Sequence, residues 1–276
     1  MTQNKVSLNK FNISNDLPFT LIAGPCALES HDHAKLMVEK LLEITSKVKI
    51  NFIYKTSYDK ANRTSLNADR GMGLDASLRI FSDLKDEYDI SILTDVHTVN
   101  DCVSIKDYVD VIQIPAFLCR QTDLLIAAAK TMKIINIKKG QFLSPYDMIN
   151  VANKILDTGN KNLLLTERGV SFGYNTLVSD MRSLEIMKNE IKFPVIFDAT
   201  HSVQAPGGQG ASSGGDRQFV PVLAKAAVAV GVGGVFIETH ENPDKAPSDG
   251  PNMVKIDDLY ELIMKLIEID NVVKQS

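Results

Sequence analysis

Eight short apolar runs divide the chain, and each is followed by residues that do not belong in a hydrophobic interior. In chain order, the residues at these ends are Cys26, Lys55, Asp95, Gln113, Lys138, Glu167 with Arg168, Asp198 with His201, and Glu238. Apolar runs of this length between turn residues are typical of buried strands. Because an unpaired charge is costly in such a setting, polar side chains gathered at one end of the strands predict a ligand site there.

Helical patterns separate the apolar runs. They cover residues 33–49, 76–88, about 100–106, 121–131, 145–157, 180–190, 218–230 and 256–273. Strand followed by helix, repeated eight times, predicts an α/β fold, a single (β/α)8 TIM barrel. A doubly wound open sheet is the alternative, but no Gly-x-Gly-x-x-Gly turn follows the first run.

The first 16 residues precede the predicted barrel, which spans residues 17–276. Within them, Val6–Leu8 and Phe11–Ile13 alternate around a turn and predict a β-hairpin that caps the bottom of the barrel. The N-terminal stretch has no apolar core of a signal peptide, and no stretch has the ~20 apolar residues needed to cross a bilayer. Three scattered cysteines make no disulfide framework, so we expect a cytoplasmic protein. The net charge of −4 argues against nucleic acid or an anionic membrane as partner.

Residues 206–216 contain five glycines in eleven positions. Such a composition is typical of a flexible linker. The segment lies between the seventh strand and its helix, however, where a domain boundary would split the barrel. We therefore expect a mobile loop at the active site.

Basic residues gather at the strand ends although the chain as a whole is acidic. They are Lys55, Lys60, Arg63, Lys138 and Arg168. The loop after the second strand adds Asn62, Thr64 and Ser65 beside Arg63, a group of donors suited to a phosphate. A solvated loop and lysines with stems packed on the barrel are the alternatives. The convergence of several cations on one barrel mouth favours an anion site.

Four potential metal ligands come from strands one, seven and eight and from the loop after strand eight. They are Cys26, His201, Glu238 and Asp249. These strands are neighbours in a closed barrel, and the donor set suits Zn²⁺, Fe²⁺, Mn²⁺ or Co²⁺. Three of them also have a structural alternative: Cys26 as a small buried hydrophobe, His201 as a cap and Asp249 as a turn residue. Glu238 is the hardest to dismiss, because a carboxylate after an apolar strand needs a partner.

The motifs taken together are similar to those of the 3-deoxy-D-manno-octulosonate 8-phosphate synthase family. They are Ala23–Cys26 with Glu29 and Ser30, Lys60–Ser65, Gln113–Leu118, Ile137–Phe142, Thr166–Gly169, Asp198–Gln204, Glu238–His240 and Ser248–Pro251. The resemblance runs from about Leu17 to the C-terminus. The related heptulosonate 7-phosphate synthases usually carry Lys-Pro-Arg where this chain has Lys60-Ala61-Asn62-Arg63.

The resemblance implies a transferase of lipopolysaccharide precursor biosynthesis. It would condense phosphoenolpyruvate with D-arabinose 5-phosphate and water, and release phosphate. Phosphoenolpyruvate is assigned to Lys55, Lys60, Lys138 and Arg168, and the sugar phosphate to Asn62, Arg63, Thr64 and Ser65, with further substrate contacts from Gln113, Phe117 and Arg120. The catalytic set is Lys60, Asp95, Lys138, Arg168 and His201.

The resemblance also implies a metal and an assembly. Cys26 places the chain with the metal-dependent members, because the independent ones carry Asn at this position. Phe117 and Arg120 reach a neighbouring subunit's site in the family, which implies a homotetramer. A heptulosonate synthase that uses erythrose 4-phosphate, a zinc-dependent aldolase and a non-catalytic sugar-phosphate-binding barrel remain the alternatives.

Overall fold

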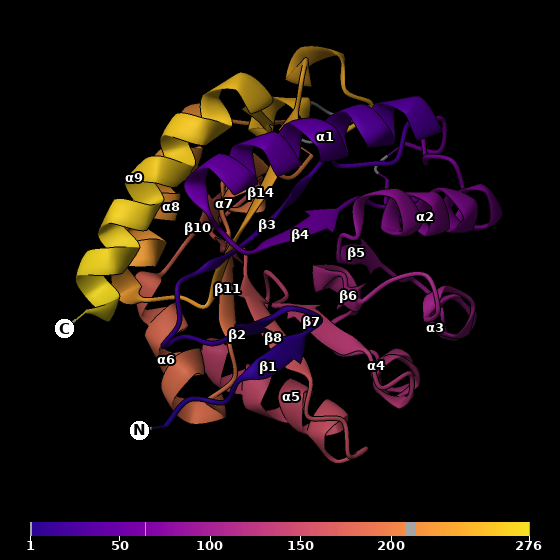
Figure 1. Ribbon diagram of the computed structural model, residues 1–276. Coiled ribbons are helices and arrows are strands. Elements are labelled where there is room, and N and C mark those ends of the chain that lie inside the picture. The colour runs from indigo at the N-terminus through magenta and orange to yellow at the C-terminus, as the bar shows by residue number, and fades with distance from the viewer. Residues whose placement is uncertain (1, 64, 208–213, 276) are drawn as a thin grey trace.

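The computed structural model describes residues 2–63, 65–207 and 214–275. Parallel strands form a closed barrel, and helices surround it (Figure 1). The barrel strands are β3 (Thr20–Gly24), β4 (Phe52–Lys55), β5 (Ile92–Asp95), β6 (Val111–Ile114), β7 (Ile134–Lys138), β8 (Leu163–Glu167), β11 (Val195–Asp198) and β14 (Gly234–His240). The predicted TIM barrel is therefore confirmed.

The barrel closes between the last strand and the first. In β14, Gly234 pairs with Thr20 of β3, and on its other side the same residue pairs with Ile196 of β11. At the far end of the ladder, Glu238 pairs with Gly24. Closure thus brings the Cys26 turn beside Glu238, and it excludes the doubly wound open sheet.

The outer helices match the predicted helical segments to within a few residues, although residues 145–147 form a separate 3-10 turn. They are α1 (His31–Val48), α2 (Leu74–Tyr88), α3 (Val99–Ile105), α4 (Thr122–Lys130), α5 (Met148–Leu156), α6 (Met181–Ile191), α8 (Val220–Val230) and α9 (Ile256–Lys274). A single additional turn, α7 (Ala199–Ser202), follows β11 directly. Sequence periodicity missed it because one turn is too short to show a helical pattern.

Amphipathic patterning explains how the helices dock. In α1, Met37, Val38 and Leu41 are fully buried against the barrel, and burial of side chains of this size contributes roughly 1.5–3 kcal/mol each. The helix starts where the Ser30 hydroxyl accepts a hydrogen bond from the backbone N–H of His33. This cap fixes the turn that carries the chain from β3 into α1.

The predicted N-terminal hairpin is present as β1 (Val6–Leu8) and β2 (Phe11–Ile13). Its turn residue Asn9 donates to the Ser91 hydroxyl at 2.8 Å, just before β5. The Asn4 amide donates to the carbonyl of Lys192, which precedes β11. The hairpin therefore lies against the N-terminal ends of the strands, opposite the predicted site (Figure 1).

Short strand pairs complete the structure. They are β9 (Val170–Ser171) with β10 (Leu177–Val178), β12 (Gln204–Ala205) with β13 (Gly214–Gly215), and β15 (Val254–Lys255), which extends β14. Among the residues that the structure describes, no helix has the length and apolar character needed to cross a membrane.

Candidate active site

A cavity of about 580 Å³ opens at the C-terminal ends of the barrel strands. Most of the predicted site residues line it: Lys55, Lys60, Asn62, Arg63, Asp95, Gln113, Phe117, Lys138, Arg168, His201 and Asp249. The polar residues that end the strands thus share one chamber, where parallel barrels place their ligand sites.

The Cys26 thiol lies in a cluster with two carboxylates. Its Sγ is 3.0 Å from Oδ2 of Asp249, and ligand atoms of Cys26, Glu238 and Asp249 all lie within 4.8 Å of one another. Gly24 allows this approach, since a Cβ on this residue would stand 2.0 Å from the carbonyl oxygen of Lys55. Side chains that are distant in the sequence therefore meet at the closure of the barrel.

His201 reaches the same cluster from the single turn α7. Its Nε2 is 3.7 Å from Oε2 of Glu238, and its Nδ1 is 2.7 Å from Oδ2 of Asp198. Asp198 also accepts the backbone N–H of His201 and so caps α7. A carboxylate on one ring nitrogen orients the other nitrogen toward a metal in many protein sites.

The ionisable groups of the cluster shift one another's pKa values. Burial opposes ionisation of Glu238, but Lys55 and His201 outweigh it and hold the pKa of Glu238 below its ordinary value. Burial also opposes the charge of Lys60, but the neighbouring acidic groups, Cys26 and Glu238 first, nevertheless raise the pKa of Lys60. The burial of Cys26, with Glu238 nearby, raises the pKa of its thiol.

These residues fit a divalent cation. Among the described residues, Oε2 of the fully buried Glu238 has no hydrogen-bond partner, which is costly for a carboxylate. A cation placed among Cys26, Glu238 and Asp249 would satisfy this oxygen and offset the carboxylates that oppose thiolate formation. Thiolate, imidazole and carboxylate together match a borderline ion such as Zn²⁺ or Fe²⁺.

Two buried cations, Lys138 and Arg168, line the cavity beside His201 and Gln204. Lys138 Nζ contacts Oδ2 of Asp198 at 2.5 Å, and Arg168 Nη2 donates to Oε1 of Gln204 at 2.9 Å. Burial lowers the pKa of Lys138 despite Asp198, and burial also lowers that of Arg168. Nη1 of Arg168 is buried and has no partner among the described residues, so a guanidinium donor is available to an anion.

The loop after β4 also contributes side chains to the cavity, among them Lys60 and Arg63. Lys60 Nζ donates to the Ser57 hydroxyl at 2.9 Å, and Ser57 donates in turn to Asp95. Arg63 Nη1 donates to the Ser248 hydroxyl at 2.5 Å, which links this loop to the segment that carries Asp249. Thr64 lies outside the described residues.

Two predicted substrate-binding residues lie outside the cavity lining. Ser65 is half-buried in the loop beyond Arg63, and Arg120 is exposed with its carbonyl accepting from Lys154 at 3.1 Å. Phe117 lies at the rim and is 55% exposed. Neither Arg120 nor Phe117 is enclosed within a single chain.

The glycine-rich segment is held at its base. Gln204 and Ala205 in β12 pair with Gly215 and Gly214 in β13, so the segment starts and ends in one small ladder. This arrangement contradicts a linker between domains and agrees with a loop beside the cavity, which Pro206 and Gly207 line. Residues 208–213 lie outside the described residues.

Several residues of the site have no role assigned from the sequence, although Asp198 and Gln204 belong to the strand-end motifs. Asp198 follows an apolar strand as Glu238 does, and the same argument identifies it as a buried carboxylate that needs a partner. His97 lies at 3.0 Å from Oδ2 of Asp95 and lines the cavity. Ser57 and Gln204 are uncharged, and their positions became evident only from the fold.

Comparisons with known proteins agree with this architecture. The model of the DAHP synthetase I family matches residues 3–275. The 2-dehydro-3-deoxyphosphooctonate aldolase of Bartonella tribocorum is 61% identical over 271 residues, which cover 98% of this chain and 97% of the relative. The protein of the same name from Chelativorans sp. is 63% identical, over 99% of this chain and 98% of its own length. The one from Brucella ovis is 61% identical, over 98% of this chain and 97% of its own length. The chain therefore belongs to the DAHP synthetase I family.

Proposed function

We propose that this protein condenses phosphoenolpyruvate with D-arabinose 5-phosphate and water to give 3-deoxy-D-manno-octulosonate 8-phosphate and phosphate. The observation that carries the proposal is a single cavity that joins buried cations to a thiol–carboxylate cluster. The full-length similarity to aldolases named for this product supports the same reaction.

The charges of the cavity suit two polyanionic substrates. Lys138 and Arg168, with Lys55 and Lys60, bind the carboxylate and phosphate of phosphoenolpyruvate. Asn62 and Arg63 bind the phosphate of the sugar on the neighbouring side. Holding both reactants aligned supplies roughly 7–11 kcal/mol of the barrier reduction.

The reaction forms one carbon–carbon bond. C3 of phosphoenolpyruvate attacks the aldehyde carbon of the sugar, whose oxygen becomes a hydroxyl after protonation. Water adds at C2, and the C2–O bond to phosphate breaks with its electron pair leaving on the phosphate. Lys60 stabilises the developing alkoxide, and Asp95 with His97 orients the water.

A divalent metal belongs to this proposal. Cys26, His201, Glu238 and Asp249 would hold it, and it would supply Lewis acidity toward the aldehyde or the water. Asp198 keeps the His201 ring in position through the contact at Nδ1. The buried Oε2 of Glu238, which has no hydrogen-bond partner among the described residues, supports this assignment.

The protein works as a homotetramer in this proposal. Aromatic side chains are exposed close to the mouth, among them Phe117, Phe142, Phe172 and Tyr174. Large apolar surfaces of this kind are typical of protein interfaces. Arg120, which is exposed and does not line the cavity of its own chain, is then available to a neighbouring one. Light scattering after gel filtration tests the assembly.

Product analysis in H₂¹⁸O tests the reaction itself. With phosphoenolpyruvate and arabinose 5-phosphate, mass spectrometry should detect an eight-carbon sugar acid phosphate. The released phosphate should be unlabelled, because water attacks carbon and the bridging oxygen leaves with phosphorus. Labelled phosphate, or consumption of phosphoenolpyruvate without the eight-carbon product, would contradict the proposal.

A further inference from the structure

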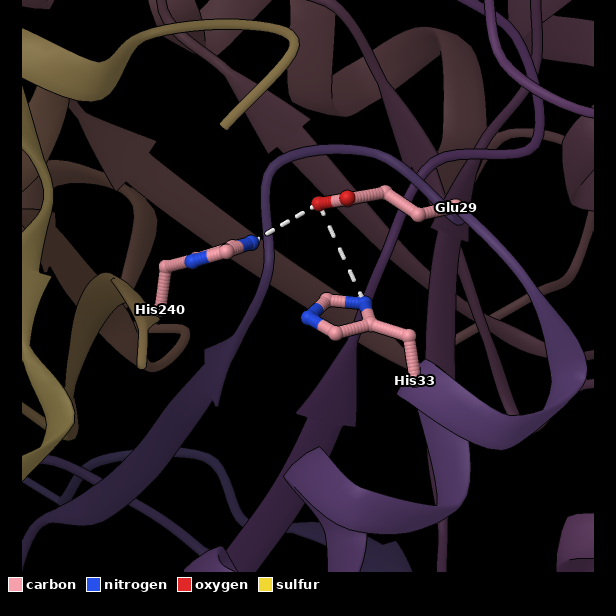
Figure 2. Close-up of side chains that lie close together, drawn as sticks. All are labelled: Glu29, His33 and His240. Carbon is pink, nitrogen blue, oxygen red and sulfur yellow. Dashed lines mark hydrogen bonds and ion pairs between the residues drawn. The ribbon is translucent and has the colours of Figure 1, made fainter. Parts of the chain in front are cut away.

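A second cluster of metal-ligating side chains lies outside the cavity, between the barrel and α1. Glu29 comes from the turn before α1, His33 from its first turn, and His240 from the end of β14 (Figure 2). None of the three lines the catalytic cavity. The reaction proposed above gives this cluster no task.

The two imidazoles face one carboxylate oxygen. Nε2 of His240 lies 2.9 Å from Oε1 of Glu29, and Nδ1 of His33 lies 3.9 Å from the same oxygen (Figure 2). The three ligand atoms all lie within 4.8 Å of one another. Tetrahedral zinc with bonds of about 2.0–2.1 Å separates its ligands by roughly 3.3 Å, and the two distances to Oε1 of Glu29 lie on either side of that value.

One of these nitrogens makes no hydrogen bond within the described residues. Nδ1 of His33 is buried and makes no hydrogen bond within the described part of the chain. The side chain of His240 is 96% buried, since only 4% of it is exposed. An imidazole lone pair that is removed from water and left unpaired is costly unless a ligand takes it.

Glu241 holds the far side of both rings. Its Oε2 is 3.0 Å from Nε2 of His33 and 3.2 Å from Nδ1 of His240. This carboxylate can therefore accept the protons of the far nitrogens and leave the near nitrogens free for a metal, as outer carboxylates do at zinc sites. Nδ1 of His240 also lies 2.9 Å from the backbone N–H of Asn242, a bond that must yield when this nitrogen carries a proton.

We propose that Glu29, His33 and His240 form a second metal site, which binds Zn²⁺, with Glu241 as its orienting carboxylate. Two imidazoles and one carboxylate are a zinc donor set, and Glu29, which is exposed, gives the ion a path from solvent. Bound zinc ties the Cys26–α1 turn to the end of β14 and stabilises the fold by mass action.

Zinc stoichiometry after equilibrium dialysis tests the site. The background is the Cys26→Ala/His201→Ala double variant, which removes two ligands of the catalytic cluster. This protein should keep about one tightly bound Zn²⁺ per chain. Adding His33→Ala should abolish that binding. His31→Ala is the matched control, because His31 belongs to the same helix and contacts Asp83 at 3.3 Å instead, and it should retain the zinc.

Two further measurements distinguish loss of the zinc site from misfolding of a variant. Glu241→Gln keeps all three ligands and should weaken zinc binding about 10–100-fold. In the wild type, Co²⁺ should show thiolate charge transfer from Cys26 together with a second set of d–d bands. Only the d–d bands should survive in the double variant. No zinc bound to the double variant, or equal zinc affinity in the His33→Ala and His31→Ala proteins, would overturn the proposal.

Discussion

The ammonium of Lys55 lies 2.7 Å from Oε1 of Glu238, and both side chains are almost completely buried. The pair joins β4 to β14 across the intervening strand β3, where Gly24 lets the backbone of Lys55 approach closely. The other oxygen of Glu238 contacts His201, and Glu238 itself is grouped with Cys26 and Asp249. Glu238 therefore neutralises the buried charge of Lys55 and also belongs to the candidate metal site.

Lys55→Met should destabilise the protein by about 3–5 kcal/mol, because it leaves the Glu238 carboxylate buried beside fewer cations. Urea unfolding of the metal-free protein at pH 7 measures the change. Lys47→Met is the control, since Lys47 pairs with Glu43 at a similar 2.6 Å on the surface. The control should leave the free energy of unfolding unchanged, and an equal loss in both variants would refute the account.

Arg63→Ala should raise the KM for arabinose 5-phosphate at least tenfold more than the KM for phosphoenolpyruvate. Its guanidinium lines the cavity and contacts Ser248, at the place proposed for the sugar phosphate. Arg70→Ala is the matched control, because Arg70 belongs to the same loop and pairs with Asp59 outside the cavity. Steady-state kinetics with each substrate varied measures both values. An equal rise in both KM values for Arg63→Ala contradicts the assignment of two separate phosphate sites.

Asp198→Asn should lower the affinity for the catalytic metal about 10–100-fold. The change removes the charge that holds His201 and pairs with Lys138, while the shape of the side chain is kept. Competition with a chromophoric chelator gives the affinity. Unchanged metal affinity would show that His201 needs no orienting carboxylate.

His97 should make stability depend on pH. Burial opposes its charge, but the hydrogen bond to Asp95 raises the pKa of His97 above its ordinary 6.5. A raised pKa in the folded state means that the stabilisation is fully present below about pH 6.5 and is lost as pH rises through the folded value. His97→Gln should therefore cost more stability at pH 6 than at pH 9 in urea unfolding. The reverse order contradicts the pairing.

The barrel was predictable because eight apolar runs alternate with helical segments and polar residues mark one strand end. The same logic brought Cys26 together with Glu238, since strand eight closes on strand one. It also placed Lys138 and Arg168 in one cavity. Patterns that repeat along the chain thus predicted most of the fold and much of the candidate site.

Features that depend on a single contact could not be predicted. His201 belongs to one turn of helix, which leaves no periodic signal, and its orientation depends on Asp198. His33 contacts Glu241, and His240 contacts Glu29, and each pair is separated by more than 200 residues in sequence. Spacing therefore gave no indication of these contacts. Only the packing of α1 against the end of β14 brings these side chains together.

The initial rate of phosphate release tests the central claim most directly. It should be measured with phosphoenolpyruvate and either arabinose 5-phosphate or erythrose 4-phosphate, before chelation, after chelation, and after a divalent metal is restored. The account predicts rapid release with arabinose 5-phosphate alone, its loss on chelation and its recovery with metal. Full activity in the metal-free protein, or a preference for erythrose 4-phosphate, would contradict it.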